Sequence, residues 1–389
     1  MTRKLLHVCN DLAYWTAHRR AVAQHAQDAG WDVTIATAPH PSADDLPKQG
    51  FRHLALPIDR FRLRPRDDLR LLAALLPLMS NARFEAVHLF TMKPLLLGGL
   101  AARLADLIYM HQTARLIATV AGIGRGFSGG ARGWKSAALQ RGLALGLGRT
   151  AAALTFENTG DRDFYVGSGM IDEARTDVFP GAGIDLRLFA PSTARAADIV
   201  TVLFAGRLLR SKGVMDLVGA AGILEQRFGN RVRILIAGPH TDGDPDGLDE
   251  RERQALQRGH LVSYLGAVPL DEMPALMASA DIFVLPTRYP EGLPRVLLEA
   301  AATGAALIAG DVDGTRAFVT HGVNGLLLPR TDEAAIADAI GELVTAPDLR
   351  RRLGQAAREK VTQGGYDIRD IATRFLQLYE KPPGNAASR

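Results

Sequence analysis

Cysteine is almost absent from this sequence, and that scarcity excludes several classes of protein. The chain of 389 residues has one cysteine, Cys9, so no intramolecular disulfide framework can form, and the composition fits a reducing compartment. No group of histidines and cysteines has the spacing of a zinc site. A hydrophobic content of 47% with 23% charged residues is typical of a globular protein, and the length suits two domains of ordinary size.

Long apolar runs are also lacking. The best candidate for a membrane span, 94–109, is short and carries Arg103 and Asp106, whereas a spanning helix needs about 20 mostly apolar residues. The N-terminal stretch MTRKLLHVCND has too short an apolar run for a signal peptide. We therefore expect a cytoplasmic protein whose membrane association is peripheral.

Aromatic residues make up only 6% of the chain, which leaves no stacking platform for nucleic-acid bases and argues against a nucleic-acid partner. The charge is uneven: residues 1–190 contain 23 Lys and Arg against 17 Asp and Glu, and the remainder contains 23 against 25. The densest basic stretch is Arg60-Phe61-Arg62-Leu63-Arg64-Pro65-Arg66. It is either a solvated loop or a contact for anionic lipid headgroups or a lipid diphosphate.

Apolar runs of strand length alternate with segments of helical spacing along nearly the whole chain. This alternation predicts parallel sheets covered by helices on both faces. It pauses at 180–185 and 191–193, which are rich in glycine, proline and small polar residues, as linkers are. We predict two doubly wound α/β domains, 1–190 and 191–365, followed by a C-terminal helix and tail, 366–389. In such tandem folds the last helix often packs back on the first domain.

Two glutamates, Glu291 and Glu299, follow the apolar run Ile282–Leu285, which we interpret as a buried strand. A helical rise over eight residues separates them by roughly 12 Å. That distance is too long for a coupled acid/base pair and suits two ends of one long ligand. Gly292 allows the backbone to approach a ligand closely, and Pro294 suits a first helical turn.

A second polar loop follows the strand predicted at Val200–Ala205. It carries Arg207 and Lys212, flanked by Gly206 and Gly213. Fixed positive charge beside backbone donors and a helix N-terminus is what a diphosphate requires. Alone the loop would be a solvated basic segment, but it leaves the same edge of the same predicted sheet as the Glu291 loop. The two together predict a diphosphate site.

The combination of these motifs resembles the retaining GT-B glycosyltransferases of family GT4. The likeness rests on Gly206-Arg207 with Lys212-Gly213 and on the E-x7-E spacing of Glu291 and Glu299. Two further segments are similar to the family's interdomain P-x-G-x-D and late G-x-R…NGLL motifs: Pro180-Gly181-Ala182-Gly183-Ile184-Asp185, and Asp313-Gly314-Thr315-Arg316 with Asn324-Gly325-Leu326-Leu327. The segment 91–98 resembles a branch that extends polyprenyl-diphosphate-linked sugars in bacterial surface-glycan assembly, of which N-acetylgalactosaminyl transferases are typical.

This resemblance implies a GT-B fold, in which two Rossmann-like domains face each other across a cleft, and it implies residue roles. Arg207 and Lys212 would hold the donor diphosphate and stabilise the leaving group. Glu291 would contact the donor sugar, Glu299 the ribose hydroxyls. Backbone contacts are implied for Gly292, Leu293 and Pro294 around sugar and phosphate, and for Gly266, Ala267 and Val268 around the base. The implied catalytic set is Glu291, Arg207 and Lys212, without a metal or cofactor.

The sequence departs from the family pattern in the first half. Ala121 stands where many GT4 members carry a histidine near the reacting face of the sugar, and His111 upstream is interpreted as structural. The first loop reads Asn10-Asp11-Leu12-Ala13-Tyr14 and lacks the usual paired glycines. The candidate acceptor contacts are Asn10, His18, Arg19 and Lys93.

Three other motifs are set aside. Asp311-Val312-Asp313 has D-x-D spacing but is interpreted as a structural loop, and the segment 242–253 starts like a calcium loop but ends in Arg253 rather than glutamate. The glycines at 122, 124 and 126 lack the G-x-G-x-x-G spacing of a nicotinamide site, and no G-x-S-x-G elbow occurs.

With the resemblance, the sequence predicts a metal-independent retaining hexosyltransferase at the inner face of the inner membrane. The first hypothesis is transfer of an N-acetylhexosamine from a UDP-sugar to an undecaprenyl-diphosphate-linked saccharide, with an anionic membrane contacting the basic N-terminal domain. One alternative is a GDP-mannose donor or a soluble acceptor. A more remote one is a catalytically silent nucleotide-binding protein of the same fold.

Overall fold

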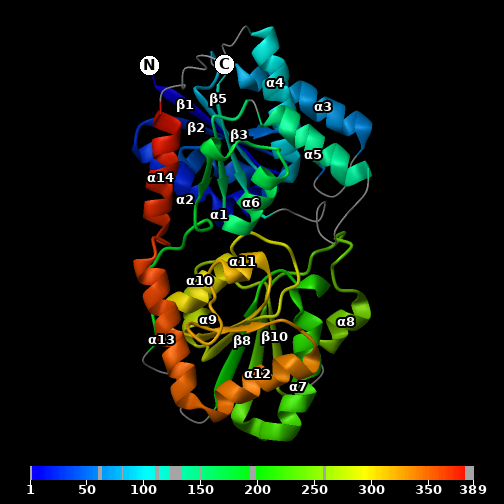
Figure 1. The fold of residues 1–389 in the computed structure, drawn as a ribbon, viewed down its shortest axis with the longest axis vertical. Helices are drawn as coiled ribbons and strands as arrows, with labels where there is room; N and C mark the ends of the chain where they lie inside the picture. The colour runs from blue at the N-terminus through cyan, green and yellow to red at the C-terminus, as the bar shows by residue number, and fades with distance from the viewer. Residues whose placement is uncertain are drawn as a thin grey trace. The chain divides into compact units, whose positions relative to one another are not determined.

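A computed structural model describes residues 2–59, 64–80, 82–109, 114–122, 134–148, 150–192, 199–256 and 260–381. The chain folds into two compact units: the first is Met1–Ala182 with Ile368–Arg389, and the second is Gly183–Asp367. Figure 1 shows each unit as a sheet with helices on both faces. Arg60 to Leu63, His111 and the stretch Ile123 to Gly126 lie outside the described residues.

The sheet of the first unit has seven parallel strands in its described part, in the order β3-β2-β1-β4-β5-β6-β7. Along the chain they are β1 Arg3–Val8, β2 Trp31–Thr37, β3 Arg52–Ala55, β4 Ala86–Phe90, β5 Arg115–Val120, β6 Ala153–Phe156 and β7 Thr176–Val178. The central strands are buried on both faces, as expected where helices cover a parallel sheet on both sides. Sequential order reverses between β1 and β4.

The helices of the first unit form two layers (Figure 1). One layer packs its apolar side chains with Leu5, Val33 and Ile117, and comprises α1 Leu12–His18, α2 Arg20–Asp28 and α14 Ile368–Glu380. The other packs with Leu6 and Val87, and comprises α3 Pro65–Leu75, α4 Gly99–Ile108, α5 Trp134–Gly146 and α6 Thr159–Gly167. Shorter helical turns are η1 Pro41–Asp45, η2 Pro47–Gln49, η3 Leu76–Met79, the π-helical η4 Pro94–Gly98 and η5 Glu173–Arg175.

The sequence pattern predicts one helix over 16–29, but the structure has two. The first begins at Leu12 because the side chain of Asp11 accepts a hydrogen bond from the Tyr14 backbone N–H, which is an N-cap. The break falls at Arg19, whose backbone is not helical. Periodicity cannot reveal such a break, since both pieces keep the apolar face that packs on the sheet.

In its described residues, the second unit has six parallel strands in the order β10-β9-β8-β11-β12-β13. They are β8 Val200–Ala205, β9 Val232–Ala237, β10 Val262–Gly266, β11 Ile282–Leu285, β12 Ala306–Gly310 and β13 Leu326–Leu328. The helical elements are η6 Arg210–Lys212, α7 Val214–Phe228, η7 Gly229–Arg231, α8 Glu250–Ala255, α9 Met273–Ala278, α10 Arg295–Ala302, α11 Asp313–Arg316, α12 Glu333–Thr345 and α13 Pro347–Gln363. The predicted fold class, two Rossmann-like parallel α/β sheets, is confirmed.

The last helix, α14, is connected to the sheet of the first unit by a series of buried hydrogen bonds. The Tyr379 hydroxyl bonds His7 Nε2 at 3.2 Å and His88 Nδ1 at 2.7 Å. Trp15 Nε1 donates to His7 Nδ1 at 3.2 Å. Because an indole N–H can only donate, His7 must carry its proton on Nε2 and donate it to Tyr379. The tyrosine then donates to His88, which in turn donates from Nε2 to Thr119 at 2.7 Å.

Burial keeps both of these histidines neutral. Burial, and to a smaller extent nearby Arg19, lower the pKa of His7 to about 3, and both also hold the pKa of His88 well below its usual value. Among the described residues, no helix combines the length and the apolar character needed to cross a bilayer.

Candidate active site

The candidate site of the second unit lies where the strand order reverses, between β8 and β11. In such sheets the loops that follow the two central strands diverge, and ligands bind at the carboxyl ends of those strands. The loop after β8 carries Arg207 and Lys212, and the loop after β11 carries Glu291. The structure therefore brings the two sequence-predicted polar loops to one edge of one sheet.

Close backbone packing fixes these two loops against each other. Gly213, with φ of +74°, ends the η6 turn, and a Cβ there would lie 2.3 Å from the carbonyl oxygen of Pro286. The Arg288 N–H donates to the Ser211 carbonyl at 2.7 Å. Glycine is needed at 213 both for its left-handed backbone and for this contact.

Lys212 is buried and paired with Glu291. Its Nζ lies 2.6 Å from each carboxylate oxygen, and the two side chains are only 7% and 19% exposed. The pair spans 79 residues of sequence. A buried ammonium needs a compensating anion, and here Glu291 supplies it.

Arg207 and Lys212 flank one aromatic ring. The guanidinium carbon of Arg207 lies 5.8 Å and Lys212 Nζ lies 5.9 Å from the ring centroid of Tyr289, within cation–π range. Among the described residues Arg207 forms no ion pair, so its charge is available to an anionic ligand. Tyr289 was not identified as a site residue from the sequence, although it adjoins the Glu291 motif.

Glu299 lies on α10, one turn after Arg295, and the two form an ion pair of 2.8 Å. Burial raises the pKa of the Glu299 carboxyl, and Arg295 partly opposes that rise. Pro294 is the residue immediately before α10, with extended backbone, and Gly292, Leu293 and Pro294 are all buried.

The segment Asp313–Arg316 packs against the backbone of the Glu291 loop. A Cβ on Gly314 would lie 1.8 Å from the Gly292 carbonyl oxygen and 2.4 Å from that of Glu291. Only glycine allows this contact. Arg316 pairs with Asp311 at 2.6 Å and with Asp313 at 2.5 Å, which agrees with a structural reading of the D-x-D spacing.

Arg288 is a further residue that the sequence did not reveal. Its guanidinium donates to the Thr331 hydroxyl at 2.7 Å and pairs with Asp216 at 2.8 Å. These contacts tie the loops after β11 and β13 to α7. They border a pocket of about 460 Å³ that also includes Asp311 and Asp332.

Gly266 is the last residue of β10, an edge strand of the sheet, and Val268 lies in the loop that follows. The Gly266 carbonyl accepts from the Gly238 N–H at 2.7 Å, and Tyr264 donates its hydroxyl proton to the Gly238 carbonyl at 3.0 Å. The loops after β9 and β10 are thus joined through backbone groups. Val268 packs on the core.

The acceptor candidates lie in the first unit, at or near its own reversal point between β1 and β4. The Asn10 N–H donates to the Thr91 hydroxyl at 3.1 Å, while Asn10 Oδ1 is buried without a hydrogen-bond partner. Thr91 has a positive φ of +67°, and no other non-glycine residue in the described part of the chain has a positive φ. Such strain concentrates at functional sites.

Two of the candidate acceptor residues are engaged in buried ion pairs. Arg19 is fully buried, lies 2.8 Å from Glu157 and stacks over Phe90 at 4.9 Å. Lys93 is 8% exposed and lies 2.9 Å from Asp68. His18 is half-buried with its ring 4.6 Å from that of Tyr14. Arg19 therefore has no surface for a ligand in this conformation.

The alanine at the position of the family histidine, Ala121, directly follows β5. Among the described residues, no group of three or more His, Cys, Asp or Glu side chains is arranged to hold a metal ion.

Comparison with protein families assigns both units. Residues 190–360 match the model of glycosyl transferases group 1, and residues 16–182 match the glycosyl transferase 4-like domain. The two models together span most of the chain, in the order expected for a two-unit glycosyltransferase. The protein belongs to the group 1, GT4-type glycosyltransferases of GT-B fold.

Individual relatives align with only part of the chain. The chain is 32% identical over 221 residues to D-inositol 3-phosphate glycosyltransferase of Corynebacterium urealyticum, covering 53% of this chain and 51% of that protein. It is 29% identical over 246 residues to a GDP-mannose-dependent alpha-(1-6)-phosphatidylinositol monomannoside mannosyltransferase of Mycobacterium tuberculosis, covering 59% and 62%. The chain thus spans about half to three-fifths of the length of these relatives.

Among solved structures, HepE of Anabaena in complex with UDP and glucose superimposes with a TM-score of 0.77 at 18% identity, covering 98% of this chain and 100% of that one. At this identity the likeness concerns the fold.

Proposed function

We propose that the protein transfers a glycosyl group from a nucleotide-diphosphate sugar to a hydroxyl of a lipid-linked acceptor. The observation that carries the proposal is the convergence of Arg207, Lys212 and Glu291 at the reversal point of the second sheet. Two cations on one aromatic ring form a site for a diphosphate. The carboxylate bonded to Lys212 is placed to exchange that bond for a sugar hydroxyl.

The proposed reaction retains the configuration at the anomeric carbon. The bond from that carbon to the diphosphate oxygen breaks, and the acceptor oxygen forms its bond on the same face. The acceptor proton moves to the leaving diphosphate. Arg207 and Lys212 stabilise the charge that develops on this leaving group. No metal or cofactor is needed in this scheme.

The nucleoside end of the donor is assigned to Glu299 and to the backbone after β10. Glu299 accepts hydrogen bonds from the ribose hydroxyls, and Gly266 and Val268 frame the base through main-chain groups. Gly292, Leu293 and Pro294 form the turn around sugar and phosphate. Contacts made by main-chain groups alone do not discriminate between uracil and guanine.

For the finer specificity, we propose a UDP-N-acetylhexosamine donor and an undecaprenyl-diphosphate-linked saccharide acceptor at the inner membrane face. Asn10, His18 and Lys93 are the proposed acceptor contacts, and the buried, unpaired Asn10 Oδ1 supports the first of them. Arg19 is assigned to positioning the α1–α2 junction instead.

A second candidate is GDP-mannose with a phosphoinositol acceptor. It is favoured by the relative named as a GDP-mannose-dependent phosphatidylinositol monomannoside mannosyltransferase. A soluble acceptor is a further variant of this candidate.

Thermal-shift titration with UDP, GDP and their sugars tests the donor, because a ligand that binds the native state raises Tm. Transfer assays with and without lipid-linked saccharide test the acceptor. Lys212→Ala should remove both nucleotide binding and transfer, while Lys48→Ala, at an exposed lysine, should keep both. Full activity in Lys212→Ala would overturn the diphosphate assignment, and nucleotide binding without transfer or donor hydrolysis would indicate a binding protein.

A further inference from the structure

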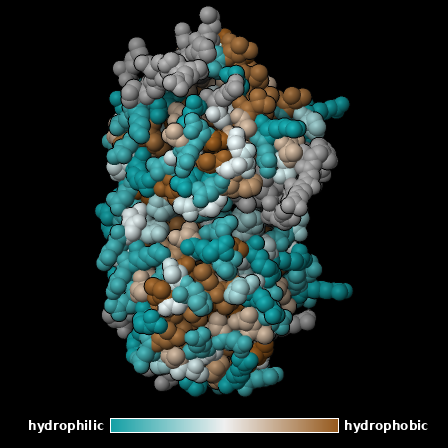
Figure 2. Space-filling model, viewed as in Figure 1, coloured by the Kyte–Doolittle hydropathy of each residue, from teal (hydrophilic) through white to brown (hydrophobic). Residues whose placement is uncertain are grey.

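In the described part of the first unit, the exposed large apolar side chains lie on the layer formed by α3, α4 and α5. Leu104, Leu107 and Ile108 on α4 are 43%, 80% and 57% exposed. They share one face of the helix, since residues three and four apart are neighbours. Figure 2 shows hydrophobic residues gathered over α4 at that end of the first unit.

Neighbouring helices extend this group. The backbones of α4 and α5 meet at Gly99 and Gly146, where an added Cβ on Gly146 would lie 2.7 Å from the Gly99 carbonyl carbon. Leu145, next to this contact, is 61% exposed. On α3, which packs against α4, Leu69 is 64% exposed. Solvent-exposed leucines thus occur on three adjacent helices of one layer.

Each of these helices also places an exposed arginine one turn before an exposed leucine. The pairs are Arg66 with Leu69, Arg103 with Leu107, and Arg141 with Leu145. At spacings of three or four residues, both members of a pair lie on one face. Apolar side chains flanked by arginines on the same face are typical of helices that lie in a membrane interface.

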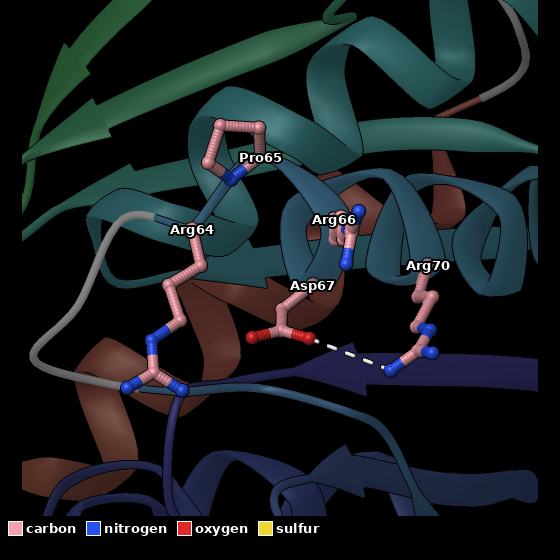
Figure 3. Close-up of a pocket in the computed structure, with 5 residues that line it drawn as sticks. All are labelled: Arg64, Pro65, Arg66, Asp67 and Arg70. Atoms are coloured by element: carbon pink, nitrogen blue, oxygen red, sulfur yellow. Dashed lines mark ion pairs between the residues drawn. The ribbon is translucent and has the colours of Figure 1, made fainter.

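The start of α3 adds a concentrated positive site. Arg64, Pro65, Arg66, Asp67 and Arg70 line a surface pocket of about 570 Å³. Figure 3 shows Arg64, Asp67 and Arg70 reaching into the same space, with Asp67 and Arg70 paired at 3.5 Å. One carboxylate against three guanidinium groups leaves this pocket positive.

The net positive charge of the α3–α5 layer favours an anionic membrane over a second copy of the chain as its partner. Segments 64–80, 82–109 and 134–148 contain eight Lys and Arg and four Asp and Glu. A second copy of the chain would bring the same positive surface against itself in a two-fold contact. A bilayer with anionic headgroups accepts both the leucines and the arginines.

We propose that the α3–α5 layer is a membrane-docking surface, in which Leu104, Leu107, Ile108 and Leu145 enter the lipid interface. The surrounding arginines, with the pocket at the start of α3, bind lipid phosphates. This deepens the proposed function, on which it rests for the location of the acceptor. The proposed membrane contact therefore combines an apolar surface with the arginines at the start of α3.

Co-sedimentation with vesicles tests this docking without donor or acceptor. The full chain should bind vesicles of phosphatidylcholine mixed with phosphatidylglycerol, and bind phosphatidylcholine alone more weakly. The double variant Leu107→Glu/Ile108→Glu should weaken binding by about tenfold or more, because two apolar side chains no longer enter the interface. Leu270→Glu, at a leucine 63% exposed in the second unit, should bind like the unmodified chain.

A second variant keeps the surface apolar. Arg103→Gln/Arg141→Gln should reduce binding to the anionic vesicles by roughly fivefold for each charge and leave binding to phosphatidylcholine unchanged. Equal binding by the leucine variant and the Leu270 control, or no binding by the unmodified chain, overturns the proposal. A dimer that becomes monomeric in the leucine variant, without loss of vesicle binding, overturns it in favour of a second copy.

Failure of the docking surface is distinguishable from failure of the proposed function. Nucleotide-induced stabilisation reports on the second unit and should be the same in all these variants. Vesicle binding without transfer would contradict the function alone. Transfer to a detergent-solubilised acceptor without vesicle binding would contradict the docking surface alone.

Discussion

The Lys212–Glu291 pair gives the sharpest prediction, because it requires opposite effects on stability and on nucleotide binding. Glu291→Gln removes the counter-charge of an ammonium that is only 7% exposed. Breaking a buried ion pair costs about 3–5 kcal/mol. The glutamine oxygen still accepts one hydrogen bond, and the site at 291 is 19% exposed, so the expected loss of stability is about 2 kcal/mol.

The same substitution should strengthen binding of UDP or GDP. In the proposed binding mode, the diphosphate of the nucleotide displaces the Glu291 carboxylate from Lys212 of the unmodified protein and then lies near that carboxylate. Two like charges about 6 Å apart repel by roughly 3 kcal/mol at an effective dielectric constant near 20. Solvent screening reduces this repulsion. Because Glu291→Gln removes the repulsion, we expect the affinity of this variant for UDP or GDP to increase about tenfold. Sugar transfer should nevertheless fall, since Glu291 is the proposed sugar contact.

The assay combines urea unfolding with nucleotide titration on the full chain. Lys212→Met should lose nucleotide binding, and the double variant Lys212→Met/Glu291→Gln should be destabilised by less than the sum of the singles, as expected for residues in contact. Glu225→Gln, at an exposed glutamate on α7, is the charge-matched control. A nucleotide affinity in Glu291→Gln that is unchanged or reduced would refute the exchange of carboxylate for diphosphate.

Three other predictions test the supporting structure. The pKa of His7 is lowered to about 3 by burial, so the stability that the neutral imidazole contributes should be present above about pH 6.5 and be lost as the unfolded chain takes up protons at lower pH. The expected loss from His7 is about 2 kcal/mol at pH 5, and His88, whose pKa is also lowered, should act in the same direction. Tyr379→Phe should add a pH-independent loss of about 1–2 kcal/mol, and urea unfolding at pH 7.5 and pH 5 measures both effects. Thr91→Ala should be more destabilising than Thr91→Gly by roughly 1 kcal/mol, because glycine relieves the positive φ while both lose the hydroxyl; equal urea midpoints would contradict the strain. Gly314→Ala should displace the Glu291 loop, because the added Cβ would meet its backbone, and should reduce nucleotide affinity about tenfold or more in a nucleotide titration. The control Gly222→Ala adds a Cβ that meets open space on α7 and should leave the affinity unchanged.

Much of the second unit follows from local sequence. The strands Val200–Ala205 and Ile282–Leu285 are predicted and observed with the same bounds, because each is a largely buried apolar run followed by a polar loop. The placement of Arg207 and Lys212 at one sheet edge with Glu291 follows from strand alternation. Their detailed contacts do not.

What the sequence could not reveal depends on contacts between distant segments. Lys212 meets Glu291 across 79 residues, and the Gly314 backbone meets the Glu291 loop only because β12 lies beside β11. Arg19 shows the same limit in the first unit. A single arginine in a helical segment resembles a solvated or ligand-binding residue, and only the fold shows that Glu157 neutralises it inside the protein.

The two reversal points carry different chemistry, and the difference bears on how an acceptor is recognised. In the second unit one cation, Arg207, forms no ion pair among the described residues, and the other is paired with a carboxylate that a ligand can replace. In the first unit the nearby cations Arg19 and Lys93 are held in buried ion pairs, whereas the side-chain oxygen of Asn10, Oδ1, has no hydrogen-bond partner. This edge therefore offers a sugar hydroxyl the neutral side chain of Asn10, whereas the charge of Lys93 is engaged by Asp68. The charge of a lipid phosphate must be met elsewhere, and the arginine pocket at the start of α3 supplies a positive site joined to this edge by the Lys93–Asp68 pair.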